Sequence, residues 1–374
     1  MIGQNRKRLR ELGIVIGQFE PGPHDSITDV PGVRVGHVTL VHGEGPLIPG
    51  KGPVRTGVTA IRPRENTFIE RVVGGAYVLN GAGEVSGMTQ LDEWGLLETP
   101  ILLTNTLSLG RVSSAAAAWM IQRYPDIGVS SDVIIPVVGE CDDSWLNDSA
   151  GQHVDTHHVF DAIESAHSGP VAEGAVGGGT GMVCFDFKAG IGSASRVVTI
   201  GKSSFTVGVL TMTNFGAMRH LRLDGLRLGE LLEPEFDGFN RRRVSQGSII
   251  VVLATDAPMM ALQVRRLCKR AALGVGRAGS HAEPGSGEII IGFSTANTVP
   301  RVADPDAIYK LDVLLDSSMG PFYAATIEAT EEAIMNSLTM AEEMTGLDGH
   351  LAPALPLDRL VDLYDRHLWG RRRS

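Results

Sequence analysis

Three small groups of polar residues stand at the edges of apolar runs, where they could take part in acyl-transfer chemistry. The first is Ser248, which follows Gly247 and precedes the apolar run IIVVLA. A serine hydroxyl attacks a carbonyl only when a base takes its proton. Cleavage of the Gly247–Ser248 bond would give Ser248 an α-amine with a pKa of about 7.7–8.0, which suits a general base. Locally, however, Gly-Ser is more often a loop that ends where a strand begins.

The second group is a serine with a carboxylate, and the third is a single side-chain amide. Ser286 and Glu288 lie two residues apart in GSGEIII, so on a strand they share one face and could relay or orient a proton. A strand-edge serine beside a surface glutamate is slightly favoured by spacing alone. Asn214 ends the run VGVLTMTN, where its amide could donate to a developing oxyanion. A turn asparagine before Phe-Gly is the more common case.

Two further motifs suggest ligand binding but fit it poorly. The segment AVGGGTGM (175–182) lacks both the Lys-Ser/Thr ending of a P-loop and the GxGxxG spacing. It predicts a tight turn or a backbone wall beside a substrate. In HVDTHH (153–158), Thr156 as a helix N-cap would place His157 and His158 on different faces of a helix. We therefore assign no metal site from the sequence.

The elements that must position these residues follow from the pattern of apolar residues. Short Val/Ile/Thr-rich runs edged by some of the 46 glycines predict strands within 72–87, 131–140, 204–216, 247–256 and 287–297. Several runs are almost continuously apolar, which indicates strands buried on both faces. Helices are predicted at 113–124, at 157–167 after Thr156, at 258–273 before Gly274, and at 323–345 before Gly346. This mixture predicts a layered α/β or α+β domain.

Composition limits the class of protein and its partners. The 374 residues can form one large domain, and 20% charged with 43% hydrophobic residues is ordinary for a globular chain. We expect one compact domain over 1–374, with 233–246 as its most exposed connection. A net charge of −10 argues against nucleic acid as a partner.

Apolar runs and cysteine content indicate the cellular compartment. No apolar run reaches the roughly 18 residues of a membrane span, and the first residues lack the apolar core of a signal peptide. We therefore expect no membrane partner. Cys141, Cys184 and Cys268 are three in number and have no metal-type spacing, which predicts a reducing, cytoplasmic location.

Many stretches along the chain together resemble the P1-type self-processing aminopeptidases. This family includes the L-aminopeptidase/D-esterase-amidases and the β-peptidyl aminopeptidases. The matching stretches include SITDVPGVRVGHVTL (26–40), GVTAIRPR (57–64), LNGAGEVSG (79–87), PILLTNTLSLG (100–110), LNDSAGQHV (146–154), GAVGGGTGMVCFDFKAGIGSASR (174–196), TNFG (213–216), GSIIVVLATDAP (247–258) and GSGEIIIGFSTAN (285–297). Their combination is highly specific, although no single stretch is.

The resemblance implies an α+β fold and a processed chain. The fold is a four-layer α/β/β/α sandwich similar to that of N-terminal-nucleophile hydrolases, with different strand connectivity. Cleavage between Gly247 and Ser248 would give an α chain of residues 1–247 and a β chain of residues 248–374. The local sequence favours a simple loop at Gly247-Ser248, but the resemblance favours a functional residue. It implies that Ser248 is both the self-cleaving residue and the nucleophile.

The resemblance also implies roles for the remaining site residues. Ser286 and Glu288 match the serine and acid that support the nucleophile, and Asn214 matches the oxyanion donor. Glu140 matches the acid that holds the free amino group of the substrate, a strong anchor in a partly dry cleft. The chain departs from the family where an aromatic residue, commonly Tyr, is expected, because it has Asp142 there. Either Trp145 fills that space or the pocket is more acidic than usual.

We therefore expect a self-cleaving serine aminopeptidase or amidase that hydrolyses amide or ester bonds next to a free amino group. It would act on small peptides or amino-acid amides without a cofactor, as a tetramer of cleaved heterodimers. Two alternatives are a self-processed acyltransferase and a catalytically silent small-molecule-binding homologue. A nucleotide binder built on GGGTG is a third. The sequence does not choose between α- and β-peptides or between D- and L-amino acids.

Overall fold

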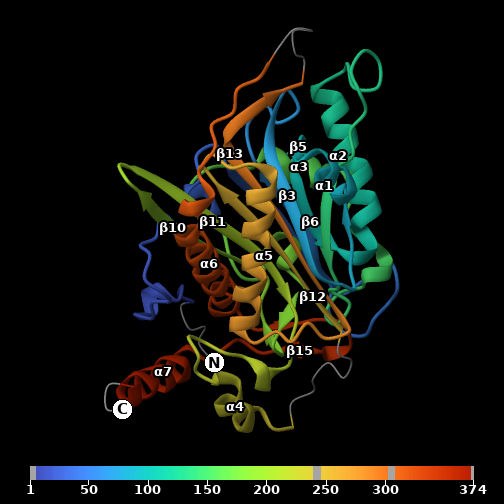
Figure 1. Ribbon diagram of the computed structural model, residues 1–374. Coiled ribbons are helices and arrows are strands. Elements are labelled where there is room, and N and C mark those ends of the chain that lie inside the picture. Colours follow the sequence, from blue (N-terminus) through green and yellow to red (C-terminus); the bar gives the residue numbers. More distant parts are fainter. Residues whose placement is uncertain (1–5, 239–245, 302–307, 372–374) are drawn as a thin grey trace.

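The computed structural model describes residues 6–238, 246–301 and 308–371, and it consists mainly of two stacked sheets between layers of helices (Figure 1). The larger sheet has the order β10-β11-β12-β13-β3-β5, and the smaller has the order β1-β2-β6-β7-β4. The strands of the larger sheet are β10 (Ile191–Ile200), β11 (Ser203–Asn214), β12 (Gln246–Thr255), β13 (Gly285–Pro300), β3 (Glu70–Gly81) and β5 (Leu96–Leu97). Those of the smaller sheet are β1 (Arg34–His42), β2 (Val54–Arg62), β6 (Ile101–Asn105), β7 (Val137–Cys141) and β4 (Val85–Ser86).

Helices cover the outer faces of both sheets. The larger sheet is covered by α5 (Ala261–Ala278) and α6 (Met319–Thr339), and the smaller by α2 (Leu109–Arg123) and α3 (Thr156–Glu164). The other elements are α1 (Met88–Trp94), α4 (Leu228–Leu232), α7 (Leu357–Arg371), and the two-stranded pairs β8 (Val183–Cys184) with β9 (Phe187–Lys188) and β14 (Met344–Thr345) with β15 (Leu351–Ala352). The expected four-layer α+β sandwich is therefore confirmed.

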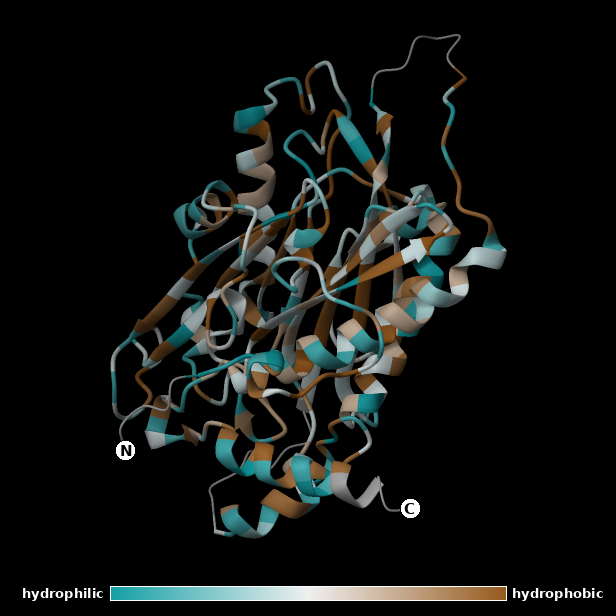
Figure 2. Ribbon diagram, turned by 90° about the vertical axis from the view of Figure 1, so that its left-hand side faces the viewer, coloured by the Kyte–Doolittle hydropathy of each residue, from teal (hydrophilic) through white to brown (hydrophobic). Residues whose placement is uncertain are grey.

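An apolar core fills the space between the two sheets. Leu103 of the smaller sheet is buried in the same cluster as Ile250 and Ile291 of the larger one, and the stacked strands are predominantly apolar in Figure 2. Residues 249–254 of β12 are all at most 1% exposed. A central strand with layers on both sides needs apolar residues on both of its faces, which explains the unbroken run IIVVLA.

The helix boundaries differ from the predicted ones. Helix α2 begins at Leu109, earlier than predicted, and α3 begins at Thr156 with Asp155 as its N-cap. The prediction of Thr156 as the cap is therefore wrong. The backbone N–H of Asp155 instead donates to Nδ1 of His158, 2.9 Å away.

Helix α5 passes through Gly274, which was predicted to follow its end. A Cβ at Gly274 would lie 2.7 Å from Cβ of Thr330 on α6, so this glycine permits close helix packing. The helix ends at Ala278 and is capped by Gly279, whose φ of +116° is left-handed. Helix α6 ends at Thr339, well before Gly346. The buried Ala341 extended the apolar pattern past the true end.

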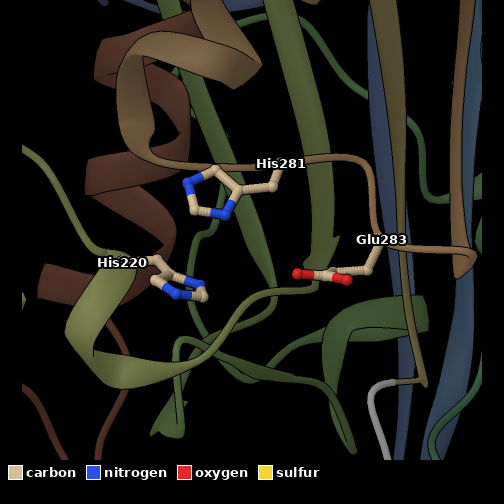
Figure 3. Close-up of side chains that lie close together, drawn as sticks. All are labelled: His220, His281 and Glu283. Atoms are coloured by element: carbon tan, nitrogen blue, oxygen red, sulfur yellow. The ribbon is translucent and has the colours of Figure 1, made fainter.

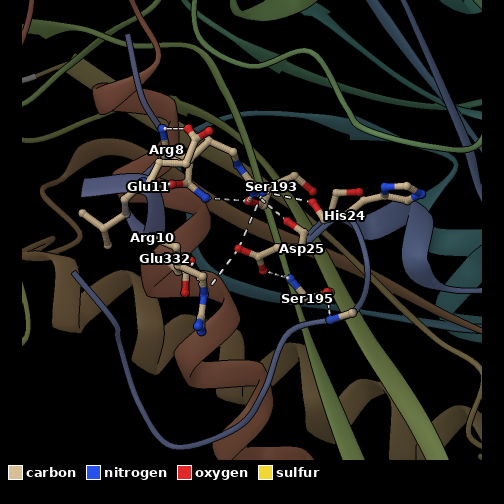
Figure 4. Close-up of polar contacts among 12 residues, drawn as sticks. Arg8, Arg10, Glu11, His24, Asp25, Ser193, Ser195 and Glu332 are labelled. Atoms are coloured by element: carbon tan, nitrogen blue, oxygen red, sulfur yellow. Dashed lines mark hydrogen bonds and ion pairs between the residues drawn. The ribbon is translucent and has the colours of Figure 1, made fainter. Parts of the chain in front are cut away.

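A buried network of charges fixes the N-terminal segment to the larger sheet and α6 (Figure 4). Arg196 of β10 is fully buried, and its guanidinium lies 2.5 Å from a carboxylate oxygen of Glu332 on α6. Arg10 also pairs with Glu332 at 2.9 Å, and Arg8 and Arg10 both lie within 3.6 Å of Asp25. These contacts join residues from both ends of the chain.

Three expectations about the remaining chain can be compared with the structure. Residues 233–236 form a 3-10 turn, and residues 239–245 of the predicted connection lie outside the described residues. The three cysteines are buried free thiols. Within the described residues, no helix has the length and apolar character needed to span a membrane.

Candidate active site

Ser248 lies near the start of the central strand β12 and is 4% exposed. It is level with Asn214 on the antiparallel neighbour β11 and with Gly287 on the parallel neighbour β13. Burial raises the pKa of the Cys141 thiol on β7 of the other sheet, and the nearby Ser248 hydroxyl lowers it through hydrogen bonding. The hydroxyl therefore faces the space between the two sheets, as Ile250 does.

Ser286 and Glu288 share one face of β13, as period-two spacing predicted. The Ser286 hydroxyl donates to Oε1 of Glu288 at 2.5 Å, and the Ser280 hydroxyl donates to the same oxygen at 3.3 Å. Glu288 is fully buried, and this burial is the main reason why its pKa is raised, although both hydroxyls lower it. Its Oε2 is buried without a hydrogen-bond partner among the described residues.

The Ser286–Glu288 pair and the Ser248 side chain lie on opposite faces of the larger sheet. Ile290, two residues after Glu288, belongs to the core beneath α5 and α6, whereas Ile250 belongs to the core between the sheets. The pair thus approaches Ser248 from the helix side. Ser286 is level with Gly247, the residue before Ser248. The pair therefore faces the backbone of Ser248 and not its hydroxyl.

Asn214 holds its amide in a fixed orientation beside Ser248. The backbone N–H of Val183 donates to Oδ1 at 3.0 Å, and Nδ2 donates to the carbonyl oxygen of Asp142 at 2.7 Å. The residue is 1% exposed. Because the acceptor end is tied to β8, the donor end is directed towards the loop after β7.

Glu140 brings a second carboxylate to the same end of the sheets. It is 4% exposed, accepts a hydrogen bond from the Thr106 hydroxyl, and accepts one from the backbone N–H of Glu84 at 2.9 Å. Burial raises its pKa, and the neighbouring carboxylates of Asp142 and Glu84 raise it further. A Cβ at Gly83 would lie 3.1 Å from Oε1 of Glu140 and 3.7 Å from Cα of Gly287. The carboxylate therefore lies close to the strand position level with Ser248.

Asp142 and Trp145 occupy the loop that follows Glu140. Oδ1 of Asp142 accepts from the backbone N–H of Ser144 at 2.9 Å, which shapes the turn. The Trp145 ring stacks on His350, with centroids 3.7 Å apart and planes 5° apart. Trp145 is thus held by a residue from near the C-terminal end of the chain.

Sequence reasoning missed several residues that position the site. Nδ2 of Asn80 donates to the carbonyl oxygens of Ser286 at 2.5 Å and Glu283 at 2.8 Å, which fixes the entry into β13. Asn80, Gly83 and Glu84 all belong to LNGAGEVSG, a stretch whose resemblance to the family assigns no role to any single residue. The segment GGGTG forms the predicted tight turn, a 3-10 turn over Gly177–Gly179.

Two sheets between helix layers, with a serine at the start of a central strand beside an amide and buried carboxylates, define a serine hydrolase of the N-terminal-nucleophile type. The chain belongs to peptidase family S58, whose family model matches residues 25–352. It is therefore a hydrolase of the aminopeptidase and amidase class, and the resemblance seen in the sequence is confirmed.

Three relatives illustrate the match. The β-peptidyl aminopeptidase BapA of Sphingosinicella xenopeptidilytica is 41% identical over 363 residues, which cover 95% of this chain and 90% of that protein. The PH0078 protein of Pyrococcus horikoshii OT3 has a TM-score of 0.92 at 47% identity and covers 96% of this chain and 99% of its own. The L-aminopeptidase D-Ala-esterase/amidase of Ochrobactrum anthropi, described as a variant of the Ntn hydrolase fold, has a TM-score of 0.88 at 38% identity and covers 96% and 98%.

Proposed function

We propose that this chain cleaves itself before Ser248 and then uses Ser248 as the nucleophile of an aminopeptidase. Its substrates are short peptides and amino-acid amides with a free amino group near the scissile carbonyl. One observation carries the proposal: Ser248 lies at the start of a central strand, between Asn214 on β11 and Gly287 on β13, with Glu140 near Gly287. The products would be residues 1–247 and 248–374, processed within one domain.

Self-cleavage begins when Oγ of Ser248 attacks the carbonyl carbon of Gly247. The C–N bond breaks, the nitrogen of Ser248 takes the proton, and an ester forms, which water hydrolyses to a free carboxylate and a free hydroxyl. The local packing explains why glycine precedes the nucleophile. A Cβ at Gly247 would lie 2.9 Å from Cα of Phe215 and 3.0 Å from the carbonyl oxygen of Asn214, so a larger residue would displace the bond from this position.

The liberated α-amine then serves as the general base for the Ser248 hydroxyl. A backbone nitrogen lies in the plane of its sheet, so it can be reached from both faces, unlike a side chain. The α-amine can therefore contact the Ser248 hydroxyl on one face of the sheet and Ser286 and Glu288 on the other. The orphaned Oε2 of Glu288 is available to accept from the ammonium that forms when the amine takes the proton.

Substrate hydrolysis repeats the same chemistry on an external amide. The Ser248 hydroxyl attacks the substrate carbonyl, and Nδ2 of Asn214 donates to the developing oxyanion, a contact worth about 2.7–4 kcal/mol in a comparable hydrolase. The α-amine of Ser248 returns its proton to the leaving amine. Water then attacks the acyl-enzyme ester and releases the acyl group.

Glu140 restricts the reaction to substrates with a free amino group. A carboxylate that is 4% exposed is stabilised by an ammonium group that reaches it. Asp142 and Glu84 add negative charge near it. We infer that the pocket favours cationic amines over neutral N-terminal groups, and that both α- and β-amino acyl groups are substrates to test, in line with the relatives' names.

Denaturing mass spectrometry of the wild type beside a Ser248→Ala variant tests the cleavage. We expect two fragments that meet at Gly247/Ser248 in the wild type and one intact chain in the variant. Hydrolysis of an aminoacyl p-nitroanilide, its β-homologue and an N-acetylated control then tests the substrate class. An uncut wild type, or equal rates with and without the acetyl group, contradicts the proposal. Adding an amine acceptor separates hydrolysis from acyl transfer, because only hydrolysis gives the free acid as the sole product.

Two further expectations belong to this proposal. We infer a homo-oligomer of the cleaved heterodimer, supported by exposed apolar side chains such as Ile308 at 92% and Leu315 at 73%, and light scattering on a sizing column would measure its mass. We also infer a reducing, cytoplasmic location, supported by three buried free thiols.

A further inference from the structure

We propose that the protein binds a zinc-type transition-metal ion through His220, His281 and Glu283. The ligand atoms of these three side chains all lie within 4.8 Å of one another. In Figure 3 the two imidazoles and the carboxylate converge from two different loops. Two imidazoles and one carboxylate are a ligand set that zinc takes in proteins, with a fourth position left for water.

The two loops that carry the ligands are already fixed against each other. His220 ends the 3-10 turn Met218–His220 after β11, and His281 and Glu283 lie between α5 and β13. A Cβ at Gly279 would lie 1.9 Å from the carbonyl oxygen of His220, so the backbones meet where only glycine fits. Next to this contact, the backbone N–H of Arg222 donates to the carbonyl oxygen of Ala278 at 2.8 Å. The backbone thus holds the ligands together before any ion binds.

Small side-chain rotations are enough to form the site. Ligand atoms about 2.1 Å from a tetrahedral zinc lie about 3.4 Å apart, so the present separation of up to 4.8 Å must shorten by less than one bond length. His281 is exposed, and His220 and Glu283 are half-buried, which leaves all three free to adjust. The imidazole rings of His220 and His281 already have centroids 4.3 Å apart.

The His157–His158 pair shows what an ordinary histidine contact looks like in this chain. These two rings are also close, with centroids 3.8 Å apart. Over residues 6–238, 246–301 and 308–371, however, His220, His281 and Glu283 form the one group of three such side chains that converges closely enough for a metal ion. Ring proximity alone therefore does not explain the convergence, and His157 provides a matched control.

An ion at this site would stiffen the entry into the strand that carries Ser286 and Glu288. The backbone N–H of Ser286 donates to the carbonyl oxygen of Glu283 at 2.8 Å. The hydroxyl of Ser280, one residue before His281, donates to Glu288 at 3.3 Å. We therefore expect bound metal to raise the melting temperature. The site is independent of the proposed cleavage, because its ligands converge in the continuous chain.

The test uses the untagged full-length protein, stripped with a chelator and then titrated with Zn²⁺ against a chelating dye. We expect one zinc per chain, and at least ~100-fold weaker binding in His220→Ala, His281→Ala and Glu283→Gln. The His157→Ala control should bind as the wild type does. Co²⁺ should give the visible absorption bands of a tetrahedral site. No stoichiometric zinc in the wild type, or unchanged affinity in His220→Ala, would overturn the proposal.

Thermal unfolding separates a lost ligand from a damaged fold. Without metal, the three ligand variants should melt close to the wild type, and added Zn²⁺ should stabilise only the wild type and His157→Ala. A Ser248→Ala chain should bind zinc with wild-type stoichiometry, which keeps this result distinct from the test of self-cleavage. Equal zinc stabilisation of wild type and ligand variants would show binding elsewhere and refute the site.

Discussion

Replacing Asn214 by aspartate would test the oxyanion role while keeping the shape of the side chain. The variant retains an oxygen that can accept from the N–H of Val183, as Oδ1 does now at 3.0 Å. It loses the donor that now lies 2.7 Å from the carbonyl oxygen of Asp142. The change therefore isolates the N–H donor from most of the packing.

The expected fall in kcat has two causes. Loss of one oxyanion donor costs about 2.7–4 kcal/mol, or about 10²–10³-fold in kcat. An ionised aspartate about 4 Å from the oxyanion adds roughly 4 kcal/mol of repulsion at an effective dielectric constant of 20. Asn214→Ala lacks this second part, so kcat should fall in the order wild type, Asn214→Ala, Asn214→Asp.

The chain offers a matched control in Asn336. Its Oδ1 accepts from the N–H of Leu9 at 2.9 Å, and its Nδ2 donates to the carbonyl oxygen of Ser193 at 2.9 Å. It is fully buried in α6. Asn336→Asp should therefore lower stability, as Asn214→Asp does, but leave kcat per folded chain within a few-fold of the wild type.

The assay is hydrolysis of an aminoacyl p-nitroanilide, normalised to the amount of cleaved chain found by mass spectrometry. Where Asn214→Asp stays uncut, the rate of self-cleavage replaces kcat as the readout, because both reactions pass through an oxyanion. Wild-type rates in Asn214→Asp, or equal rate losses in Asn214→Asp and Asn336→Asp, would refute the reasoning.

Three other predictions concern stability and the shape of the pocket. Arg196→Met leaves Glu332 buried without its 2.5 Å partner and should lower the free energy of unfolding by about 3–5 kcal/mol in urea; a loss below 1 kcal/mol would contradict the buried pair. Burial raises the pKa of Glu173 to about 7 from 4.5, so the folded state holds a proton that the unfolded state releases, and the free energy of unfolding should fall as pH rises from about 4.5 to about 7. Glu173→Gln should remove part of that slope in urea titrations at each pH, and an unchanged slope argues against the shift. A Cβ at Gly287 would lie 2.7 Å from the carbonyl oxygen of Ala82, so Gly287→Ala should displace this loop, cost about 1–3 kcal/mol and raise KM; unchanged kinetics would show that the loop does not border the substrate.

Much of the fold could be predicted because the residue types of each central strand indicate a buried strand. IIVVLA and the run IIIGF at 289–293 are apolar on both faces, and the structure places them between covering layers. The helix ends could not be predicted, because tertiary contacts decide them. Gly274 is accommodated within α5 since Thr330 of α6 needs the space, and no local rule contains that contact.

The candidate site also has features that the sequence predicts and features that it does not. Ser286 and Glu288 were placed on one face by period two, and their 2.5 Å hydrogen bond agrees. Their position on the face opposite the Ser248 hydroxyl depends on the register of β12 and β13, which pairs Ser248 with Gly287. Register is a property of two strands together. The approach of His220 to His281 and Glu283 likewise depends on how two separate loops pack together, so the spacing of these residues in the sequence does not predict it.

The strand order of the larger sheet has a consequence for the proposed cleavage. A break before Ser248 assigns β10 and β11 to one product, β12 and β13 to the other, and β3 and β5 to the first again. The shorter product is therefore the middle of a sheet whose two flanks belong to the longer one. Separation would require two ladders of hydrogen bonds to open at once, the β11–β12 ladder and the β13–β3 ladder. The two polypeptides should thus unfold as one cooperative unit, with a dissociation rate equal to the rate of global unfolding.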